Sequence, residues 1–336
     1  MTKARSRGSA VPALPYCGRG GETASLGGMT AVAPHGARLW PLASLSLAAL
    51  LLAGCAGAPE QTPSSDSPES SASMDVGSAS PELSAAESSI TGHFTVNGRD
   101  LFLNCVGDGE PTMVLEGGEG ATSSSMDAVV EAYESQLRVC RYDRANNGQS
   151  GTAPTPRTGE DLVSDLQGLL RSAGVPAPYL LVGTSAGGLL VQAYAATHAE
   201  EIAGVVAINP VPPWEEWSTR AFEAMTAQER QEETHYFAGA NGEGLDYRDI
   251  SELIAGLPVP PNIPFHLLIS TVAQCESPTD ICGRTYPAAE EIMKEIVGRW
   301  DQGRLTQVDA SHDIHLSNMD AVLHAIDDVL TRSESP

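Results

Sequence analysis

Hydrophobic and polar positions divide the chain into an N-terminal region without strand or helix periodicity and a longer region in which the two patterns alternate. Short apolar runs that predict strands alternate with longer runs in which apolar residues recur every three or four positions, as in amphipathic helices. The expected fold class is therefore α/β, a mostly parallel, twisted sheet of about eight strands flanked by helices. The predicted strands are His93–Val96, Leu101–Val106, Thr112–Leu115, Arg138–Tyr142, Tyr179–Val182, Ile202–Ile208, Pro264–Ser270 and Leu305–Val308.

Two features interrupt this regular alternation. Asn97-Gly98, between the first two predicted strands, favours a type I′ turn and hence a β-hairpin. At about residues 211–261 the pattern changes to helical patches rich in aromatic residues, which we expect to form an inserted helical cap within a folded domain of residues 91–336. The predicted helices outside this cap are Met126–Leu137, Glu160–Ala173, Leu189–Ala196, Ala288–Trp300 and Met319–Leu330.

The N-terminal region has the features of an export signal. Leu39–Ala53 is apolar, too short to span a bilayer comfortably, and of the size of a signal-peptide core. It runs into the tetrapeptide LAGC, which ends at Cys55 and resembles the lipobox of bacterial lipoproteins, in which the cysteine is lipidated and becomes the first mature residue. We therefore expect a leader over residues 1–54, with the true start at Met29, and lipidation of Cys55. The alternative is a plain secretory signal cut nearby.

Residues 55–90 consist largely of Ser, Pro, Ala, Glu and Asp. Such a composition cannot bury enough apolar surface to fold, so this segment is predicted to be a disordered tether behind the lipidated cysteine. The protein would then be exported and anchored by lipid to the outer face of the cell membrane.

The net charge of -24 narrows the possible partners. An acidic surface repels phosphate backbones, so nucleic-acid binding is not expected. It also provides no basic patch for anionic lipids, so membrane attachment would depend on the lipid anchor. The sequence identifies no protein partner.

Six cysteines are present and none forms a CxxC pair, which argues against zinc ribbons and thioredoxin-like motifs. Cys17 and Cys55 fall in the export region. The other four are an even set that fits two disulfides in an exported protein, or four unrelated buried thiols in a cytosolic one. They are Cys105, Cys140, Cys275 and Cys282.

The main candidate for chemistry is Ser185, at the centre of a G-x-S-x-G pentapeptide, Gly183–Gly187. A predicted strand precedes the pentapeptide and a predicted helix follows it, which is the context of a nucleophile elbow. The glycines allow a turn too tight for side chains and leave the serine hydroxyl exposed at the helix N-terminus. The alternative is an ordinary strand-to-helix turn with a capping serine.

A serine hydroxyl needs a base to become nucleophilic at neutral pH. His312 comes just after the last predicted strand, where it can reach over the strand ends towards Ser185. His315 would turn onto the following helix and is expected to pack or cap. The H-x-x-H spacing could suggest a metal, but no acidic or cysteine partner supports one. We expect the remaining candidates to be ordinary core or surface histidines: His198, His235 and His266.

Four segments resemble the actinobacterial-type esterases of the α/β-hydrolase fold. They are Gly98–Gly120 (GRDLFLNCVGDGEPTMVLEGGEG), Tyr142–Ser150 (YDRANNGQS), VGTSAGG around the serine and SHDIHL around the histidine, and the similarity covers about residues 91–332. The resemblance implies the order nucleophile, acid, histidine, and neither a cofactor nor a metal. It also implies an oxyanion hole from the backbone amides of Ala186 and Glu119, which would stabilise the developing alkoxide.

The resemblance leaves the acid of the triad open. Members of the fold usually carry it after the seventh strand, where this chain has Glu276 and Asp280. We favour Asp280, 32 residues before His312, with Glu276 as the alternative acid because it is nearer the strand end. Some members place the acid after the sixth strand, but here that position is Asn209, which cannot carry the charge.

The same resemblance suggests disulfide pairings. In this fold the strands that hold Cys105 and Cys140 are neighbours, so a cross-strand bridge between them is feasible. A Cys275–Cys282 bridge would close a short loop around the acid.

The resulting hypothesis is a lipoprotein that hydrolyses a carboxylic ester through an acyl-enzyme, with Ser185, His312 and Asp280 as its triad. Aromatic residues of the cap would wall an apolar pocket, which favours small or medium esters. An amidase, peptidase or lactonase could use the same triad, and a cofactor-free haloperoxidase-like activity could use the same residues. A non-catalytic surface binding lipoprotein with a vestigial triad is the alternative from another class.

Overall fold

A computed structural model describes residues 89–272 and 275–334 of the chain. The predicted leader with Met29, the lipidation site Cys55 and all but the end of the predicted tether lie outside these residues. The first described element is the strand that begins at Ile90.

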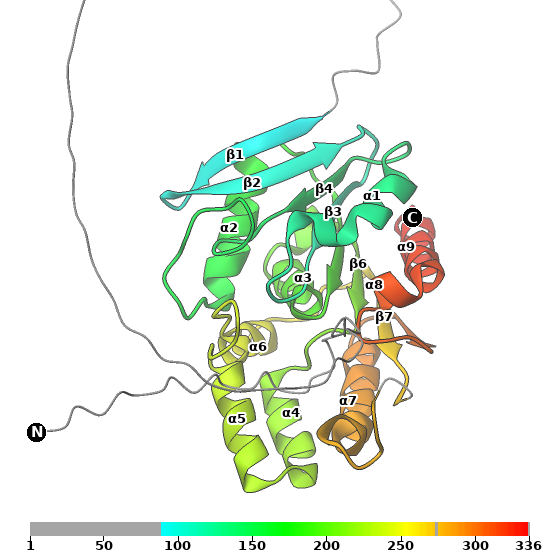
Figure 1. Ribbon diagram of the computed structural model, residues 1–336. Helices are drawn as coiled ribbons and strands as arrows, with labels where there is room; N and C mark the ends of the chain where they lie inside the picture. Colours follow the sequence, from blue (N-terminus) through cyan, green and yellow to red (C-terminus); the bar gives the residue numbers. More distant parts are fainter. Residues whose placement is uncertain (1–88, 273–274, 335–336) are drawn as a thin grey trace, which may run out of the picture. The chain divides into compact units, whose positions relative to one another are not determined.

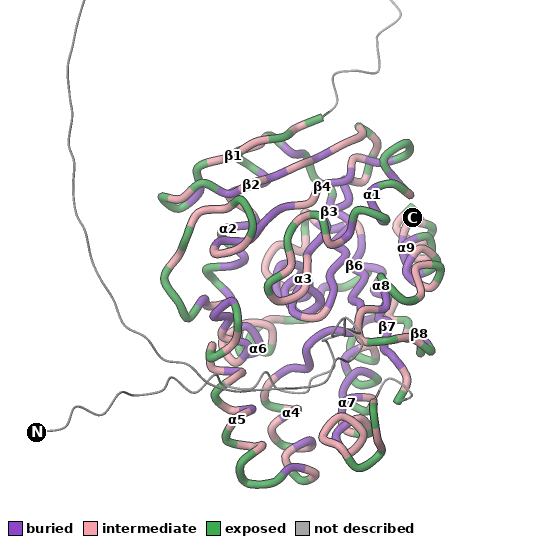
Figure 2. The backbone as a smooth tube through the Cα atoms, viewed as in Figure 1, coloured by how far each residue is buried: buried purple, intermediate pink, exposed green. Residues whose placement is uncertain are grey.

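Eight strands form one sheet in the order β1-β2-β4-β3-β5-β6-β7-β8. The strand β2 is antiparallel to β1 and to β4, and the other neighbours are parallel, which confirms the predicted mostly parallel sheet. The strands are β1 Ile90–Val96, β2 Arg99–Val106, β3 Thr112–Glu116, β4 Val139–Tyr142, β5 Tyr179–Thr184, β6 Ile202–Ile208, β7 Pro264–Ser270 and β8 Gln302–Val308. Figure 2 shows β6 buried along most of its length, whereas exposed positions recur along β1 at the edge of the sheet.

Helices cover both faces of this sheet (Figure 1). One apolar core joins the sheet to α2, α3 and α7, and a second joins its other face to α1 and α9. The helices are α1 Asp127–Tyr133, α2 Gly159–Ser172, α3 Ala186–Thr197, α4 Trp214–Arg220, α5 Ala227–Phe237, α6 Tyr247–Ala255, α7 Ile281–Gly298, α8 Ile314–Ser317 and α9 Met319–Ser333, with short 3-10 turns η1 Ser123–Met126, η2 Ala199–Glu201 and η3 Ala221–Ala224. Among the described residues, no helix combines the length and the apolar character needed to cross a membrane.

The β-hairpin and both disulfides expected from the sequence are present. Asn97 and Gly98, with φ of 49° and 78°, both adopt the left-handed backbone of the predicted turn between β1 and β2. Cys105 and Cys140 face each other in the β2–β4 register, with a Cα–Cα distance of 4.0 Å, and are disulfide-bonded. Cys275 and Cys282 form the second disulfide.

The predicted helix at Ala288–Trp300 begins earlier than its apolar pattern indicated, since α7 starts at Ile281. Asp280 is its N-cap residue, and the Asp280 Oδ1 atom accepts a hydrogen bond of 2.7 Å from the Gly283 amide. Pro287 lies inside α7 and obscured the first turns in the sequence, because proline normally ends or begins a helix.

The segment between β6 and β7 carries α4, η3, α5 and α6. Its aromatic residues pack into the same apolar core as α2, α3 and α7. The rings of Trp214 and Phe237 lie 5.1 Å apart, and Trp217 donates a hydrogen bond of 2.7 Å to Glu233. We call this segment, residues 211–261, the insertion. In Figure 1 its helices α4 and α5 lie with α7 below the sheet.

Candidate active site

Ser185 stands on a sharp turn between β5 and α3. Its φ of 51° is a backbone conformation that residues with a side chain rarely adopt. A Cβ atom on Gly183 would lie 2.3 Å from the Gly187 carbonyl oxygen, and one on Gly187 would lie 2.2 Å from the carbonyl oxygen of Glu116. Only glycine therefore fits at either position, and the close packing holds Ser185 at the start of α3.

His312 lies between β8 and α8, and its Nε2 atom is 3.1 Å from the Ser185 Oγ atom. Burial lowers the pKa of His312 to about 4; the nearby Asp313 carboxylate raises this pKa and His315 lowers it. The imidazole is therefore neutral at pH 7 and close enough to exchange a proton with Ser185.

The other ring nitrogen of His312 meets an amide. The Asn209 Nδ2 atom, directly after β6, is 2.7 Å from His312 Nδ1 and 3.3 Å from the His312 carbonyl oxygen. The Asn209 Oδ1 atom accepts a hydrogen bond of 3.2 Å from the backbone amide of Ser270. Asn209 thus occupies the position that a carboxylate holds in a Ser-His-Asp triad.

The structure does not bring either expected acid to His312. Both oxygens of Asp280 accept backbone hydrogen bonds, 2.7 Å from Gly283 and 2.9 Å from Ser277, so this carboxylate caps α7. Glu276 is exposed. Neither carboxylate makes a hydrogen bond to His312 among the described residues. The N-cap role of Asp280 was missed because Pro287 hides the first turns of α7, so the aspartate did not stand at the start of the predicted helix.

The loop after β3 lies against Ser185. A Cβ atom on Gly118 would be 3.5 Å from the Ser185 Cβ atom. The guanidinium of Arg144 donates hydrogen bonds of 2.7 Å to the Gly117 carbonyl and 2.6 Å to the Gly118 carbonyl. In a trans peptide the carbonyl and the following amide point in opposite directions, so Arg144 turns the Glu119 amide away from itself. We call Gly117–Gly120 the oxyanion loop.

A buried charge cluster holds the oxyanion loop in place. Arg144 is 4% exposed and pairs with Glu116, at the end of β3, and with Glu243, in the insertion. Glu243 also accepts a hydrogen bond of 2.9 Å from the Gly120 amide. Burial raises the pKa of Glu116; burial also acts on Glu243, but Arg144 outweighs it and lowers the pKa of Glu243. The cluster therefore joins the end of β3, the segment after β4, the oxyanion loop and the insertion.

The side chain of Glu119 ties the same loop to the insertion a second time. It accepts hydrogen bonds from the hydroxyls of Tyr236 (2.5 Å) and Tyr247 (2.9 Å) and from the Gly242 amide (2.8 Å). Burial raises the pKa of both tyrosines, so both hydroxyls stay protonated and act as donors. Glu119 thus has two separable parts, a backbone amide in the oxyanion loop and a side chain held by the insertion.

The insertion's aromatic residues do not all serve as the pocket wall that we expected. Trp217 and Phe237 are buried in the apolar core that the insertion shares with α2, α3 and α7, and Tyr236 holds Glu119. The physical reason is that the short helices α4 and α5 bury little apolar surface without these rings, which anchor the insertion to the apolar core.

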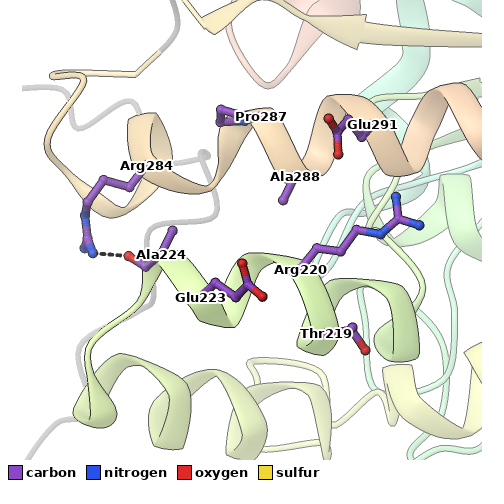
Figure 3. A pocket seen from close by; sticks show the side chains of 8 residues that line it. All are labelled: Thr219, Arg220, Glu223, Ala224, Arg284, Pro287, Ala288 and Glu291. Carbon is purple, nitrogen blue, oxygen red and sulfur yellow. Dashed lines mark hydrogen bonds between the residues drawn. The ribbon is translucent and has the colours of Figure 1, made fainter.

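A cavity of about 490 Å³ opens between α7 and the α4–η3 segment (Figure 3). Its two arginines are already paired, Arg220 with Glu295, and Arg284 with Glu229 and the Ala224 carbonyl. Neither Ser185 nor His312 lines it. The lining residues are Thr219, Arg220, Glu223, Ala224, Arg284, Pro287, Ala288 and Glu291.

Cys275, Asp280 and Cys282 place possible metal-ligand atoms within 4.8 Å of one another. The two sulfurs are joined in a disulfide, however, and a metal is bound by thiolates. Of the other histidines, His315 is buried on α8, and His266 is buried between Asp328 and Thr306, with ring-nitrogen distances of 2.8 Å to each. The two contacts of His266 join β7 to α9 and to β8.

Comparisons with known proteins agree with this architecture. A family model described as the alpha/beta hydrolase fold matches residues 111–240. Over 99 residues the chain is 32% identical to the uncharacterized protein YqjL of Bacillus subtilis (strain 168), a match that covers 30% of this chain and 39% of that protein. The chain therefore spans less than half the length of this curated relative.

Two solved structures share most of the described domain. The enol-lactonase from Burkholderia xenovorans LB400 is 25% identical, with a TM-score of 0.51 over 71% of this chain and 100% of that chain. A thermophilic esterase from Thermogutta terrifontis is 19% identical, with a TM-score of 0.52 over 73% of this chain and 99% of that chain. The sheet order, the elbow at Ser185 and these similarities together show that the chain has the α/β-hydrolase fold.

Proposed function

We propose that this protein is a serine hydrolase that cleaves a carboxylic ester through an acyl-enzyme formed on Ser185. The observation that supports the proposal most directly is the 3.1 Å contact between Ser185 Oγ, on its strained turn, and His312 Nε2. A nucleophile within hydrogen-bond reach of a neutral imidazole is the arrangement that activates a serine hydroxyl.

In the acylation step, His312 Nε2 takes the proton of the Ser185 hydroxyl as Oγ bonds to the ester carbonyl carbon. The tetrahedral intermediate then collapses, the carbon–oxygen bond to the alcohol breaks, and His312 returns the proton to the leaving alkoxide. Water repeats the sequence: it gives a proton to His312 and attacks the acyl carbon, and Ser185 leaves and recovers the proton.

The backbone amides of Glu119 and Ala186 would stabilise the negative charge of both tetrahedral intermediates. The Ala186 amide opens α3 directly after Ser185, and the Glu119 amide belongs to the oxyanion loop that Arg144 orients. One such donor contributes roughly 10²–10³ in rate. No cofactor enters these steps.

The enol-lactonase similarity bears on the type of ester. A lactone is a cyclic ester, and its hydrolysis follows the same steps without loss of a separate alcohol. We therefore include lactones with open-chain esters as candidate substrates.

The test of the proposal is covalent labelling with a fluorophosphonate probe, followed by a panel of p-nitrophenyl esters of rising chain length and matched anilides. We expect wild-type protein to be labelled and Ser185→Ala not to be. The matched control is Ser172→Ala, an exposed serine at the end of α2, which should be labelled like wild type. Folded wild-type protein that neither reacts with the probe nor hydrolyses any ester would refute the hydrolase proposal. Anilides cleaved faster than esters would make it an amidase instead.

We also propose that the protein is exported and anchored through a lipidated Cys55. The two disulfides in the domain support an oxidising compartment, because disulfides persist there and are rare in the cytosol. Mass spectrometry of the mature N-terminus tests this directly: we expect acylated Cys55, and an unmodified start at another residue would contradict it.

A further inference from the structure

The residue at His312 Nδ1 decides which ring nitrogen of His312 carries the proton. In a Ser-His-Asp triad a carboxylate accepts a hydrogen bond from Nδ1–H, which leaves Nε2 free to take the serine proton. Here the atom 2.7 Å from Nδ1 belongs to the side-chain amide of Asn209. An amide can present either an oxygen or an NH₂ group, so its orientation sets the outcome.

Two backbone groups fix the orientation of the Asn209 amide. The Ser270 N–H, a donor only, lies 3.2 Å from one end of the amide, and that end must therefore be the oxygen. The His312 carbonyl, an acceptor only, lies 3.3 Å from the other end, which must therefore be the NH₂ group. If the amide were rotated by half a turn, its NH₂ group would face the N–H donor of Ser270, a fully buried residue. Its oxygen would then face the carbonyl oxygen of His312, and neither pair could form a hydrogen bond. The NH₂ group therefore faces Nδ1.

An NH₂ group that donates to Nδ1 requires an unprotonated Nδ1. A neutral imidazole then carries its single proton on Nε2, and this Nε2–H points at the Ser185 hydroxyl 3.1 Å away. In that tautomer the ring cannot accept the serine proton at Nε2.

We infer that Asn209 is a positioning residue that holds neutral His312 in the Nε2–H tautomer and so restrains the nucleophile Ser185. The kinetic part of this inference rests on the proposed hydrolase function, whereas the tautomer is a property of the folded protein whatever its activity. Acylation in the wild-type protein then requires the less populated Nδ1–H tautomer. Replacing the amide by a carboxylate removes the restraint, since a carboxylate only accepts hydrogen bonds.

The first test measures the tautomer by ¹⁵N NMR of the histidine side chains in the full chain at pH 7. The His312 signals are those that disappear in His312→Gln. In wild type we expect Nδ1 to have the chemical shift of an unprotonated nitrogen and Nε2 that of a protonated one, and in Asn209→Asp we expect the reverse. A protonated Nδ1 in neutral wild-type His312 would overturn the inference.

The second test measures kcat on the best p-nitrophenyl ester. Replacing the triad aspartate by asparagine lowers kcat by about 10⁴, so the opposite change, Asn209→Asp, should raise kcat at least about tenfold, with ~10⁴ as the upper limit. Asn209→Ala removes the donor without adding a charge, and its kcat should not fall below wild type. The matched control is Asn262→Asp, an exposed asparagine with the same left-handed backbone (φ of 62° against 45°), which should leave kcat unchanged.

The outcomes separate the inference from the proposed function. If wild type is labelled at Ser185 and Asn209→Asp hydrolyses no faster, or Asn209→Ala loses activity, Asn209 assists catalysis and the inference is wrong. If neither wild type nor Asn209→Asp reacts with ester or probe, the hydrolase proposal fails, and the NMR spectra still decide the tautomer.

Discussion

The two flanks of Ser185 are built in opposite ways. On one flank the oxyanion loop is held by Arg144 and Glu243 from one side and by Tyr236 and Tyr247 from another. On the other flank, the described part of the loop after β7 carries a disulfide and the helix-capping carboxylate of Asp280, and the amide of Asn209, after β6, meets the Nδ1 atom of His312. The first flank is held by several charged contacts, whereas on the second an uncharged amide meets the ring of His312.

The difference shows how a buried charge constrains its surroundings. Arg144 and its two glutamates are each almost fully buried, so the charge of each is balanced by the others. Asn209 is buried too, but it is neutral and its contacts depend on orientation rather than on charge. The charge cluster therefore fixes the position of the oxyanion loop, whereas the Asn209 amide selects a tautomer of the His312 ring.

The largest effect that we expect comes from Arg144→Ala. This change leaves Glu116 and Glu243 buried without their partner, and breaking a buried pair in this way costs about 3–5 kcal/mol of unfolding free energy. Urea denaturation measures the loss, and ester hydrolysis should fall by at least the ~10² that one oxyanion donor contributes.

The control for that variant is Arg304→Ala, which also removes an arginine–carboxylate pair. The Arg304 side chain is 57% exposed, and its partner Asp328 also pairs with Arg332 and contacts His266, so we expect Arg304→Ala to cost only about 0–1 kcal/mol. Equal destabilisation by the two substitutions would mean that the buried cluster is no stronger than a surface pair, and the contrast between the flanks would disappear.

Glu119→Ala tests the second attachment of the oxyanion loop. The backbone amide of residue 119 remains, but the hydroxyls of Tyr236 and Tyr247 lose their acceptor. Each unsatisfied buried group lowers the free energy of unfolding by about 1–3 kcal/mol. We expect kcat to fall by about tenfold, less than the full ~10² of a lost oxyanion donor, because Arg144 still orients the loop. Glu200→Ala, an exposed glutamate in η2, is the control, and a similar fall in kcat there would rule out a specific role for Glu119.

The second flank is best examined through the pH dependence of kcat/KM. Because burial lowers the pKa of His312 to about 4, the imidazole stays neutral from pH 8 down to about 5, and kcat/KM should be flat there and fall below about pH 4. Between pH 4 and the ordinary histidine pKa of 6.5, His312 is neutral in the folded protein and largely protonated in the unfolded protein. The free energy of unfolding therefore decreases as the pH falls through this range.

Charges near His312 should shift the acidic limb of the pH profile, which is the fall of kcat/KM at low pH. Asp313→Asn should shift it to lower pH and His315→Gln to higher pH, since these two groups raise and lower the His312 pKa respectively. Asn209→Asp should shift it furthest upward, because a carboxylate would then face Nδ1. An acidic limb near pH 6.5 in the wild type would show that His312 is not desolvated as the structure indicates.

The fold and the elbow could be predicted from the sequence because each depends on local pattern. The strand Ile202–Ile208 and the hairpin at Asn97-Gly98 carry their signals in a few adjacent residues. The proximity of His312 to Ser185 follows from strand order, since parallel strands end at one edge of the sheet.

The partner of His312 could not be predicted in this way. The acid of this fold can follow β6 or β7, and the sequences of the two loops do not say which of them places a side chain against His312; here Asn209, after β6, does so. Arg144 was missed for a related reason. It lies in a segment that marked the resemblance, but its partners Glu116 and Glu243 are far from it in the sequence. A buried arginine requires carboxylates, but nothing in the sequence identifies Arg144 as buried.

The smallest effect that we expect comes from Asp280→Ala, and it separates the two possible roles of this carboxylate most clearly. If Asp280 caps α7, as its hydrogen bonds to Gly283 and Ser277 indicate, the substitution costs about 1 kcal/mol of stability and leaves kcat within roughly twofold of wild type. If Asp280 instead served His312 as the triad acid, kcat would fall by ~10⁴. Glu276→Ala, the same loop without a cap, should change neither quantity. Steady-state kinetics with urea denaturation on these two variants decides the matter, because the two roles predict activity losses that differ by about four orders of magnitude.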